Sequence, residues 1–409
     1  MQAGTQQHSF ATKLALIALA GLALRLGLRL LAGTSGYWTD GYALYAELAK
    51  GLAQGHGYAV LGGPPTAFRV PLYPLFIAGV TGGSSKAWLL IFAQSLVSSG
   101  TVVLTGLIVR RMAGPAAGLL AAAIYATWPY AAWHDVSLQE SGLFAMLAAL
   151  ATWLLLKAQD GGGKLALAAG VALGLALLTR ATLLPFAMVA LVWLGLRASL
   201  KSTLLAGAAM LAVLAPWLDY SHRVTGAYAL GTESGAALYA GNHPLLFDAY
   251  PQRSVDEGRA LVFAAHSPAE RAELAALGRD EIAVSGWYRA KGLAEITQAP
   301  LAFLRHAAIK QWAAFGPLPS PRHGPKADLA YALGWTPFLL LALAGIWQRR
   351  REWHGDGLLH LHILTFAATT ALFWAQTAHR SYLDPYLAMF AAIALAGIMP
   401  EMWRKRLEA

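Results

Sequence analysis

Long apolar runs recur along this chain, and they constrain its fold more than any other feature. A helix needs about 20 mostly apolar residues to cross a bilayer. About ten segments approach that length, near residues 11–31, 87–109, 115–133, 138–157, 164–180, 182–197, 202–219, 328–348, 358–374 and 385–402. The chain is 57% hydrophobic and only 13% charged, whereas soluble domains carry about 25% charged residues. We therefore expect an all-α polytopic membrane protein with about ten transmembrane helices.

The composition also excludes several classes of function. The chain has no cysteine, which rules out disulfides, thiol catalysis and thiolate metal sites. Its net charge of +10 does not indicate nucleic-acid binding, because the basic residues form short clusters beside apolar runs, as at membrane boundaries. The first apolar run has no clear cleavage site, so we expect it to span the membrane rather than to serve as a signal peptide.

The distribution of lysine and arginine predicts the orientation. If the N-terminus is cytoplasmic, every cytoplasmic connection is basic, as the positive-inside rule requires. These connections carry Lys13, Arg110–Arg111, Lys157, Lys164, Arg197, Lys201, Arg349–Arg351 and Arg404–Arg406. The two longest polar segments then face outside. We expect a transmembrane catalytic module over 1–219 with an outer loop at 32–86, an extracytoplasmic lid at 220–327, and C-terminal transmembrane helices over 328–409.

Both outer segments have local patterns of their own. Apolar and aromatic residues recur at helical spacing in 40–54, and Gly55–His56–Gly57 ends the run. In the large segment, glycine and asparagine predict turns near 231–243, and helices are expected at 269–277 and 282–298. The apolar stretch 164–197, which precedes the large outer segment, is either two helices or one helix kinked at Pro185.

Most of the unusual polar residues fall on the predicted outer side. They are Asp40, Arg69, His134, Asp135, Glu140, Arg180, Asn242, His379 and Arg380. A secondary transporter places such groups near the bilayer midplane, often on paired broken helices, and no such pair is present. Groups at one interfacial depth are instead what an enzyme acting on a lipid head group needs.

Each of these residues also has a purely structural interpretation. Asp40 follows Thr39 and can be a helix N-cap. The arginines can be interface anchors, and His134 with Asp135 can form a solvated turn. Glu140 lies at the start of an apolar run, where a carboxylate is costly unless it faces a partner or a cavity. Arg25, in the first run, either snorkels outward or meets a lipid phosphate.

Three motifs carry a resemblance to a known family. They are Asp40–Ala49 with Gly55–Tyr58, Pro65–Pro74 around Arg69, and His379–Tyr386; Tyr125–Pro129, Leu138–Ser141 and Tyr239–Pro244 lie between them in the same order. Together they resemble GT-C-fold glycosyltransferases that use polyprenyl-phosphate sugars, in the bacterial branch related to the lipid A aminoarabinose transferase and the protein O-mannosyltransferases. The Trp-Trp-Asp signature of oligosaccharyltransferases is absent.

The resemblance implies an inverting transferase in the bacterial cytoplasmic (inner) membrane, with its active site on the periplasmic face. It would move one sugar from undecaprenyl phosphate to a hydroxyl of a lipid or glycan acceptor in the cell envelope. Asp40 matches the catalytic carboxylate. Arg69, Arg180, His379 and Arg380 are expected at the donor phosphate, Glu140, Asp135 and His134 at a second acidic or acceptor site, and Tyr42, Tyr45 and Asn242 at the sugar. No cofactor is assigned, and a divalent cation, if one is used, is expected at Glu140.

The residue types fit this chemistry independently of the resemblance. Glycosyl transfer passes through an oxocarbenium-like state, its acceptor needs a carboxylate base, and arginine suits a leaving phosphate. Two other functions stay open. One is a glycan ligase or polymerase with a polyprenyl-pyrophosphate donor, and the other is a non-enzymatic lipid or sugar transporter.

Overall fold

The structure, a computed structural model, describes residues 2–39 and 42–408. These residues form helices and turns; one isolated bridge joins Ala59 and Pro65, and no strand occurs among the described residues. The all-α class is therefore confirmed. Asp40 lies outside the described residues.

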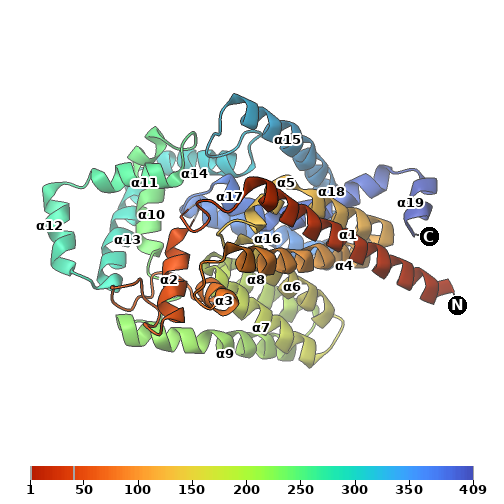
Figure 1. The fold of residues 1–409 in the computed structure, drawn as a ribbon, viewed down its shortest axis with the longest axis horizontal. Helices are drawn as coiled ribbons and strands as arrows, with labels where there is room; N and C mark the ends of the chain where they lie inside the picture. Colours follow the sequence, from red (N-terminus) through yellow and green to blue (C-terminus); the bar gives the residue numbers. More distant parts are fainter. Residues whose placement is uncertain (1, 40–41, 409) are drawn as a thin grey trace.

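The helices fall into an apolar bundle and an outer group (Figure 1). The first part of the bundle and its outer loop contain α1 (Gln2–Ala32), α2 (Ala43–Ala53), α3 (Leu72–Thr81), α4 (Ala87–Thr127), α5 (Pro129–Asp135), α6 (Ser141–Ala158), α7 (Gly163–Thr179), η1 (Ala181–Leu183), α8 (Leu184–Arg197) and α9 (Leu200–Thr225). The outer group contains α10 (Ser234–Asn242), η2 (Pro244–Asp248), α11 (Val255–Ala264), α12 (Pro268–Leu277), α13 (Glu281–Gln298) and α14 (Pro300–Phe315). The chain then returns through α15 (Pro325–Gln348), α16 (Trp353–Leu372), α17 (Thr377–Arg380), η3 (Ser381–Leu383), α18 (Asp384–Ile398) and α19 (Glu401–Glu408).

Fewer helices than expected are individually long enough to span a membrane. By length and apolarity, six segments of the described chain qualify: His8–Ala32, Ala87–Thr127, Ser141–Ala158, Leu200–Thr225, Pro325–Gln348 and Thr377–Ile398. The predicted count of about ten is not confirmed. The difference of four has three sources. The helices α7 and α8 are apolar but short, with 17 and 14 residues, α4 covers two of the predicted spans, and α16, at the predicted span 358–374, is not among the six segments.

The long helix α4 reverses direction at Gly114. This glycine has φ 89° and ψ 173°, outside helical geometry, and Pro115 follows it. Such a positive φ is accessible to glycine at little cost. A Cβ on Gly118 would lie 2.7 Å from the carbonyl oxygen of Gly106, which is possible only if the two halves run back along each other. The break that the sequence predicts between 109 and 115 is therefore present.

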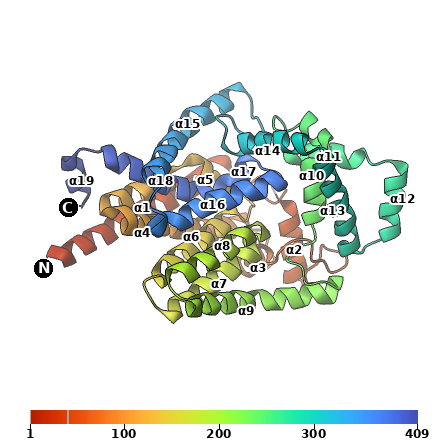
Figure 2. The same ribbon diagram turned by 180° about the vertical axis from the view of Figure 1, so that it is seen from behind.

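The segment 164–197 forms two helices rather than one kinked helix. Arg180, between them, has extended backbone with φ −152° and ψ 111°. Both helices pack on α9, as Figure 2 shows. Gly170 in α7 touches the α9 backbone at Ala206, where a Cβ would lie 2.0 Å from the carbonyl oxygen. Small residues at such contacts let membrane helices approach closely.

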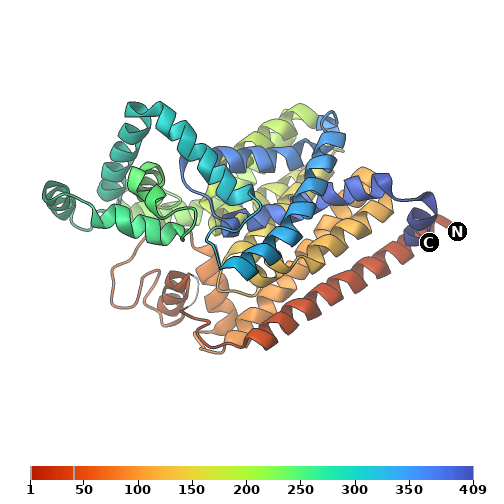
Figure 3. The same cartoon turned by 90° about the horizontal axis from the view of Figure 1, so that it is seen from above.

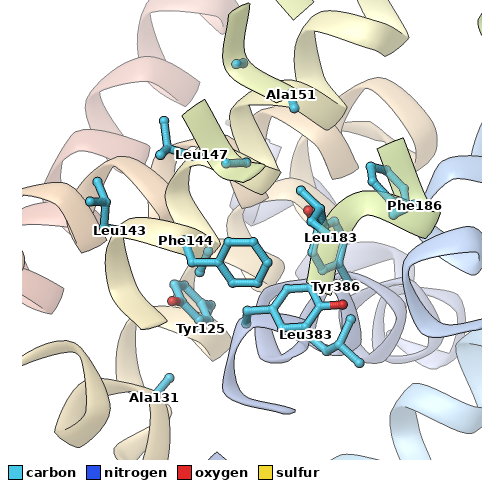
Figure 4. Packing of buried hydrophobic residues seen from close by; sticks show 14 of the residues in the cluster. Tyr125, Ala131, Leu143, Phe144, Leu147, Ala151, Leu183, Phe186, Leu383 and Tyr386 are labelled. Carbon is cyan, nitrogen blue, oxygen red and sulfur yellow. The ribbon is translucent and has the colours of Figure 1, made fainter. Parts of the chain in front are cut away.

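The most enclosed helix of the bundle is α18, which packs against α4 and α15 (Figure 3). Every residue from Asp384 to Ala394 is buried, as expected for a helix that is apolar all round. Tyr386, in its first turn, lies close to Tyr125 and Phe144 in a mostly apolar cluster (Figure 4). Phe144 of this cluster lies 5.2 Å from the guanidinium of Arg180, so the cluster borders the candidate site.

The outer helices α10–α14 lie at the end of the molecule away from both termini (Figure 1). They have a small core of their own, made by Tyr239, Ala240, Leu246, Tyr250, Val255, Val262 and Ala313, with Trp374 packed against it. The helices expected at 269–277 and 282–298 are present as α12 and α13.

The turns expected near 231–243 are wrong, because Ser234–Asn242 forms α10. Its glycines serve close packing instead. A Cβ on Gly235 would lie 1.9 Å from the carbonyl oxygen of Ser285, and one on Gly241 would lie 2.1 Å from that of Phe373.

The division at 219/220 and 327/328 stays a prediction. In the structure α9 continues to Thr225 and α15 begins at Pro325, so the polar segment between these helices covers 226–324.

We expect Gly170→Ala to lower the stability of the bundle, because the added methyl group would meet the α9 backbone. Overpacking typically costs about 1–3 kcal/mol, which exceeds the gain of about 1 kcal/mol from replacing glycine in a helix. Thermal unfolding in detergent measures this effect.

The matched control is Gly207→Ala in α9, where the nearest atom to the new methyl, Leu191 Cδ1, is 3.9 Å away. That variant should unfold at or above the wild-type temperature. Equal unfolding temperatures for the two variants would contradict the close α7–α9 contact.

Candidate active site

Tyr42 lies at the centre of a cluster of charged side chains at the outer end of the bundle. It precedes α2, and its backbone N–H donates to Leu138 O at 3.3 Å. Its hydroxyl lies 3.4 Å from His379 Nε2, and its ring lies 6.0 Å from the Arg69 guanidinium carbon. Tyr42 is thus placed between Arg69 on one side and His379 on the other.

A buried ion pair between Glu140 and Arg180 forms one wall of the cluster. Arg180 Nε donates to Glu140 Oε1 at 2.9 Å, and its Nη2 contacts the same oxygen. Arg180 Nη1 also reaches the carbonyl oxygen of His379 at 3.4 Å, and its guanidinium lies 5.2 Å from the Phe144 ring. The second carboxylate oxygen of Glu140 is buried and has no hydrogen-bond partner within the described chain.

The hydrogen bonds around His379 assign its tautomer. The backbone N–H of Gln376 donates to His379 Nδ1 at 3.1 Å. Because Nδ1 is the acceptor there, the proton of the neutral ring is on Nε2, the atom that faces Tyr42. The short helix α17 therefore directs a hydrogen-bond donor into the cluster.

Arg69 adds a second guanidinium to the cluster, 6.0 Å from the Tyr42 ring. Its guanidinium lies 5.9 Å from the Tyr45 ring, and its Nη2 donates to Glu233 Oε1 at 3.0 Å. The side chain is 26% exposed, more than that of Arg180 at 13%. Arg69 is therefore the more accessible of the two cations.

The charge states at neutral pH follow from these contacts. Burial alone would raise the pKa of Glu140, but the charge and hydrogen bonds of Arg180 outweigh it, so the pKa of Glu140 lies below its ordinary value. Burial, and then the Glu140 charge, raises the pKa of Tyr42 to about 12. Glu140 is therefore ionised and Tyr42 keeps its proton.

Asp135 lies apart from this cluster, in an ion pair with Arg25. Arg25 Nε donates to Asp135 Oδ2 at 2.9 Å, and Nη1 donates to the carbonyl oxygens of Gly21 and Ala126. The two side chains are 0% and 4% exposed. Both sequence interpretations of Arg25, as a snorkelling residue and as a lipid-phosphate contact, are wrong, because its charge is neutralised inside the protein.

Arg380 also points away from Tyr42. It donates to Asp384 Oδ1 at 3.2 Å and to Ala314 O at 2.7 Å, and its guanidinium lies 3.4 Å from the Trp335 ring centroid. Trp128 donates to the other oxygen of Asp384 at 2.9 Å. These contacts join α14, α15 and α18.

Asn242 and His134 likewise make contacts outside the cluster. The Asn242 amide donates to Leu238 O and Leu372 O, and its oxygen accepts from Lys310 Nζ at 3.1 Å. His134 Nδ1 lies 2.9 Å from Gln139 Oε1, and burial lowers the pKa of His134 to about 4. A neutral His134 supplies no positive charge to a phosphate at neutral pH.

The described residues contain no group of three or more His, Asp or Glu side chains arranged to hold a metal ion. Glu140, the residue expected at any metal site, has Arg180 as its close charged partner.

Sequence reasoning missed two residues of the site, Glu233 and Arg259. Arg259 Nη2 lies 3.5 Å from Glu233 Oε1, the oxygen that Arg69 also contacts. Both residues belong to a segment with nearly balanced charge, so each resembles an ordinary surface charge. The one available signal was Glu233 directly before the α10 pattern, a position that acidic residues favour.

The arrangement can hold an anion and supply hydrogen-bond donors beside it. Arg69 and Arg180 carry permanent positive charge. The Tyr42 hydroxyl and His379 Nε2 are hydrogen-bond donors in the same cluster. Guanidinium groups suit phosphate oxygens in both charge and geometry.

Residues 68–220 match the family model described as dolichyl-phosphate-mannose-protein mannosyltransferase. No curated protein matches the chain.

Several solved structures are similar to this one. The archaeal oligosaccharyltransferase AglB from Archaeoglobus fulgidus, in complex with an inhibitory peptide and a dolichol-phosphate, gives a TM-score of 0.54 at 17% identity over 97% of this chain and 51% of that chain. The apo form of the A. fulgidus oligosaccharyltransferase gives a TM-score of 0.53 at 16% identity, over 97% of this chain and 51% of that chain. ArnT from Cupriavidus metallidurans in the apo state gives a TM-score of 0.35 at 16% identity, over 86% of this chain and 72% of that chain. The chain spans about half the length of the oligosaccharyltransferase that it matches.

We expect Asp135→Asn to destabilise the protein, because it leaves the Arg25 charge buried and unpaired. Breaking a buried ion pair from one side typically costs about 3–5 kcal/mol. Thermal unfolding of the single variants and of Asp135→Asn combined with Arg25→Gln forms a double-mutant cycle. The double variant should recover part of the loss, and purely additive losses would contradict the ion pair.

Proposed function

We propose that the chain is a GT-C-fold glycosyltransferase that transfers a single sugar from a polyprenyl-phosphate donor to an acceptor hydroxyl; the matching family model and the fold support this. The proposed donor lipid is undecaprenyl phosphate, the acceptor is a lipid or glycan of the cell envelope, and the reaction takes place on the periplasmic face of a bacterial inner membrane. Apolar helices long enough to span a membrane place the chain in a bilayer.

The observation that carries this proposal is the pair of arginines near Tyr42: Arg69 lies 6.0 Å from its ring, and Arg180 contacts the backbone of His379, whose ring lies beside the Tyr42 hydroxyl. Arg69 and Arg180 each have one carboxylate partner, Glu233 and Glu140. They lie where the outer loop and α17 meet the bundle, beside the start of the apolar helix α6. A phosphate whose polyprenyl chain stays in lipid needs cations at that boundary.

The proposed reaction is a direct displacement at the anomeric carbon. The acceptor oxygen attacks that carbon, the bond from the carbon to the phosphate oxygen breaks, and the acceptor proton passes to a carboxylate base. The polyprenyl phosphate leaves with the electron pair, and Arg69 with Arg180 stabilises its charge as it develops. Attack from the face opposite the phosphate inverts the anomeric configuration.

We propose Asp40 as the base, with Tyr42 and Tyr45 beside the sugar. This role rests on the sequence: Asp40 is two residues before Tyr42, the residue at the centre of the cluster. Glu140 is less suited to accept a proton, because Arg180 holds its pKa below the ordinary value.

The related proteins support a monophosphate donor. The matching family model is named for a dolichyl-phosphate-linked mannose, and the A. fulgidus enzyme was solved with a dolichol-phosphate. Its other ligand was an inhibitory peptide. We propose a non-peptide acceptor here, because the chain lacks the Trp-Trp-Asp signature.

The proposed orientation predicts which positions a membrane-impermeant thiol reagent can reach in intact cells. The chain has no cysteine of its own, so single cysteines report cleanly. Cysteines at Gly62 and Ser267, both exposed, should react, whereas one at Gly162 should react only after the cells are opened. Labelling of the Gly162 position alone in intact cells would reverse the orientation.

Transfer of a radiolabelled sugar from a polyprenyl monophosphate by the purified protein tests the function. Within that assay Asp40→Asn should lower transfer by at least about 100-fold, because a positioned base contributes about 10²–10⁴-fold. Donor binding and folding should be preserved, since asparagine keeps the size and the polarity of the side chain.

The matched control is Asp280→Asn, because the Asp280 side chain is an observed N-cap that accepts from Ile282 and Ala283 N–H. It should leave transfer unchanged. Near-normal transfer by a folded Asp40→Asn variant would remove Asp40 from the mechanism and make Glu140 the leading candidate. Transfer by the wild type from a pyrophosphate donor alone would favour a glycan ligase, and lipid movement without transfer would favour a transporter.

A further inference from the structure

Two arginines converge on a single carboxylate oxygen beside the candidate site. Glu233 Oε1 lies 3.0 Å from Arg69 Nη2 and 3.5 Å from Arg259 Nη2. The arginines come from the outer loop that precedes α3 and from α11, and the carboxylate directly precedes α10. One anionic oxygen thus holds together two guanidinium groups from separate parts of the chain.

Arg259 is incompletely satisfied in this position. Its Nε is buried and has no hydrogen-bond partner in the part of the chain that the structure describes. Its other ion pair, with Asp256, spans 3.4 Å to a side chain that is 71% exposed. The guanidinium also lies 4.8 Å from the Trp374 ring, which fixes its plane without using its donors. The group therefore has unused capacity to bind an anion.

Exposure separates this triad from the structural ion pairs. The side chains of Arg69, Arg259 and Glu233 are 26%, 20% and 13% exposed. Those of Arg380 and Asp384 are 0% and 0%. A partly exposed carboxylate can leave its arginines at a modest cost, whereas an enclosed one cannot.

We propose that Arg259 is a third cation of the donor-phosphate site, beside Arg69 and Arg180, and that Glu233 occupies the position of a phosphate oxygen until the donor replaces it. The inference rests on the proposed function and deepens it. Binding of the phosphate between Arg69 and Arg259 releases Glu233, so the donor head group joins α11 to the outer loop through its own oxygens. The donor is a phosphodiester with one negative charge and two unesterified oxygens, which can accept from both arginines and from Arg259 Nε, the atom that the carboxylate leaves unpaired. The polyprenyl phosphate that leaves gains a second negative charge at the same place.

The test is equilibrium binding of radiolabelled undecaprenyl phosphate to the purified full chain. Arg259→Gln should weaken binding by about 10-fold or more, as expected for the loss of a hydrogen bond to a charged group. Glu233→Gln should tighten binding, because it removes the competing charge. Weaker binding by Arg259→Gln together with tighter binding by Glu233→Gln would identify Glu233 as an exchangeable counter-ion. In a structural ion pair, removal of either partner would weaken the fold and therefore weaken binding in both variants.

Two controls isolate the phosphate contact. Arg253→Gln makes the same charge change near α11, on a side chain that is 69% exposed and 4.0 Å from its partner Glu257, and it should leave binding within about 2-fold. Undecaprenol, which lacks the phosphate, should bind all variants equally. If Arg259→Gln does not fold, Arg259→Lys takes its place and should weaken binding, because lysine loses the planar fork.

The results also separate this inference from the function that it rests on. If the wild type does not bind undecaprenyl phosphate, the proposed function fails. If the wild type binds it and the Arg259 variant binds equally well, or if the Arg259 and Glu233 variants both weaken binding, then Arg259 is not part of the phosphate site although the proposed function stands.

Discussion

The Glu140–Arg180 ion pair determines how the outer end of the bundle is built. Neither charge is tolerated alone beside apolar helices, so the chain must bring them together. It does so by ending α7 at Thr179 and extending the backbone at Arg180, which leaves the guanidinium directed at the residue before α6. The same guanidinium contacts the His379 carbonyl, so α17 is placed by it as well. The chain interrupts its apolar helices at Arg180, between α7 and α8, and at α17. These interruptions shorten the helices, and they also bring the site residues together.

Buried charge in this protein serves two purposes, and the degree of enclosure distinguishes them. Arg25–Asp135 and Arg380–Asp384 are almost fully enclosed and are surrounded by carbonyl, hydroxyl and ring contacts. They fix helix positions around α4 and α18. Arg69, Arg259 and Glu233 are partly exposed and make fewer contacts. Because little else depends on these partly exposed pairs, a ligand can exchange with one member at low cost.

The general fold could be predicted from the sequence because its determinants are local. The lengths of the apolar runs, the clusters of basic residues, and capping patterns such as Ser267 with Glu270 each depend on neighbouring residues. The partners of individual charges could not be predicted in this way. Asp135 and Arg25 are 110 positions apart, and a local reading placed the aspartate in a solvated turn. Glu233 and Arg259 were overlooked because the sequence does not show that both face Arg69. In the sequence, the glycines of α10 indicate a turn. The structure shows that Gly235 and Gly241 are instead needed because the backbones of Ser285 and Phe373 pack against them.

The contacts of the outer group limit how much of it can move when the donor binds. Asn242 donates to Leu372 O, Lys310 donates to Ala371 O, and Tyr250 donates to Ala375 O. The first two bonds hold the last turn of α16, and the third holds the segment 373–376 that leads to α17 and His379. A displacement of α10 or α14 would therefore also displace the site. By contrast, α12 has no buried residue, and its first turn is stabilised by its own capping box. Loops that close over substrates come from the least stable parts of a structure. Movement on donor binding is therefore best accommodated in α12, while α10 and α14 stay fixed to the bundle and keep His379 and Tyr42 in register.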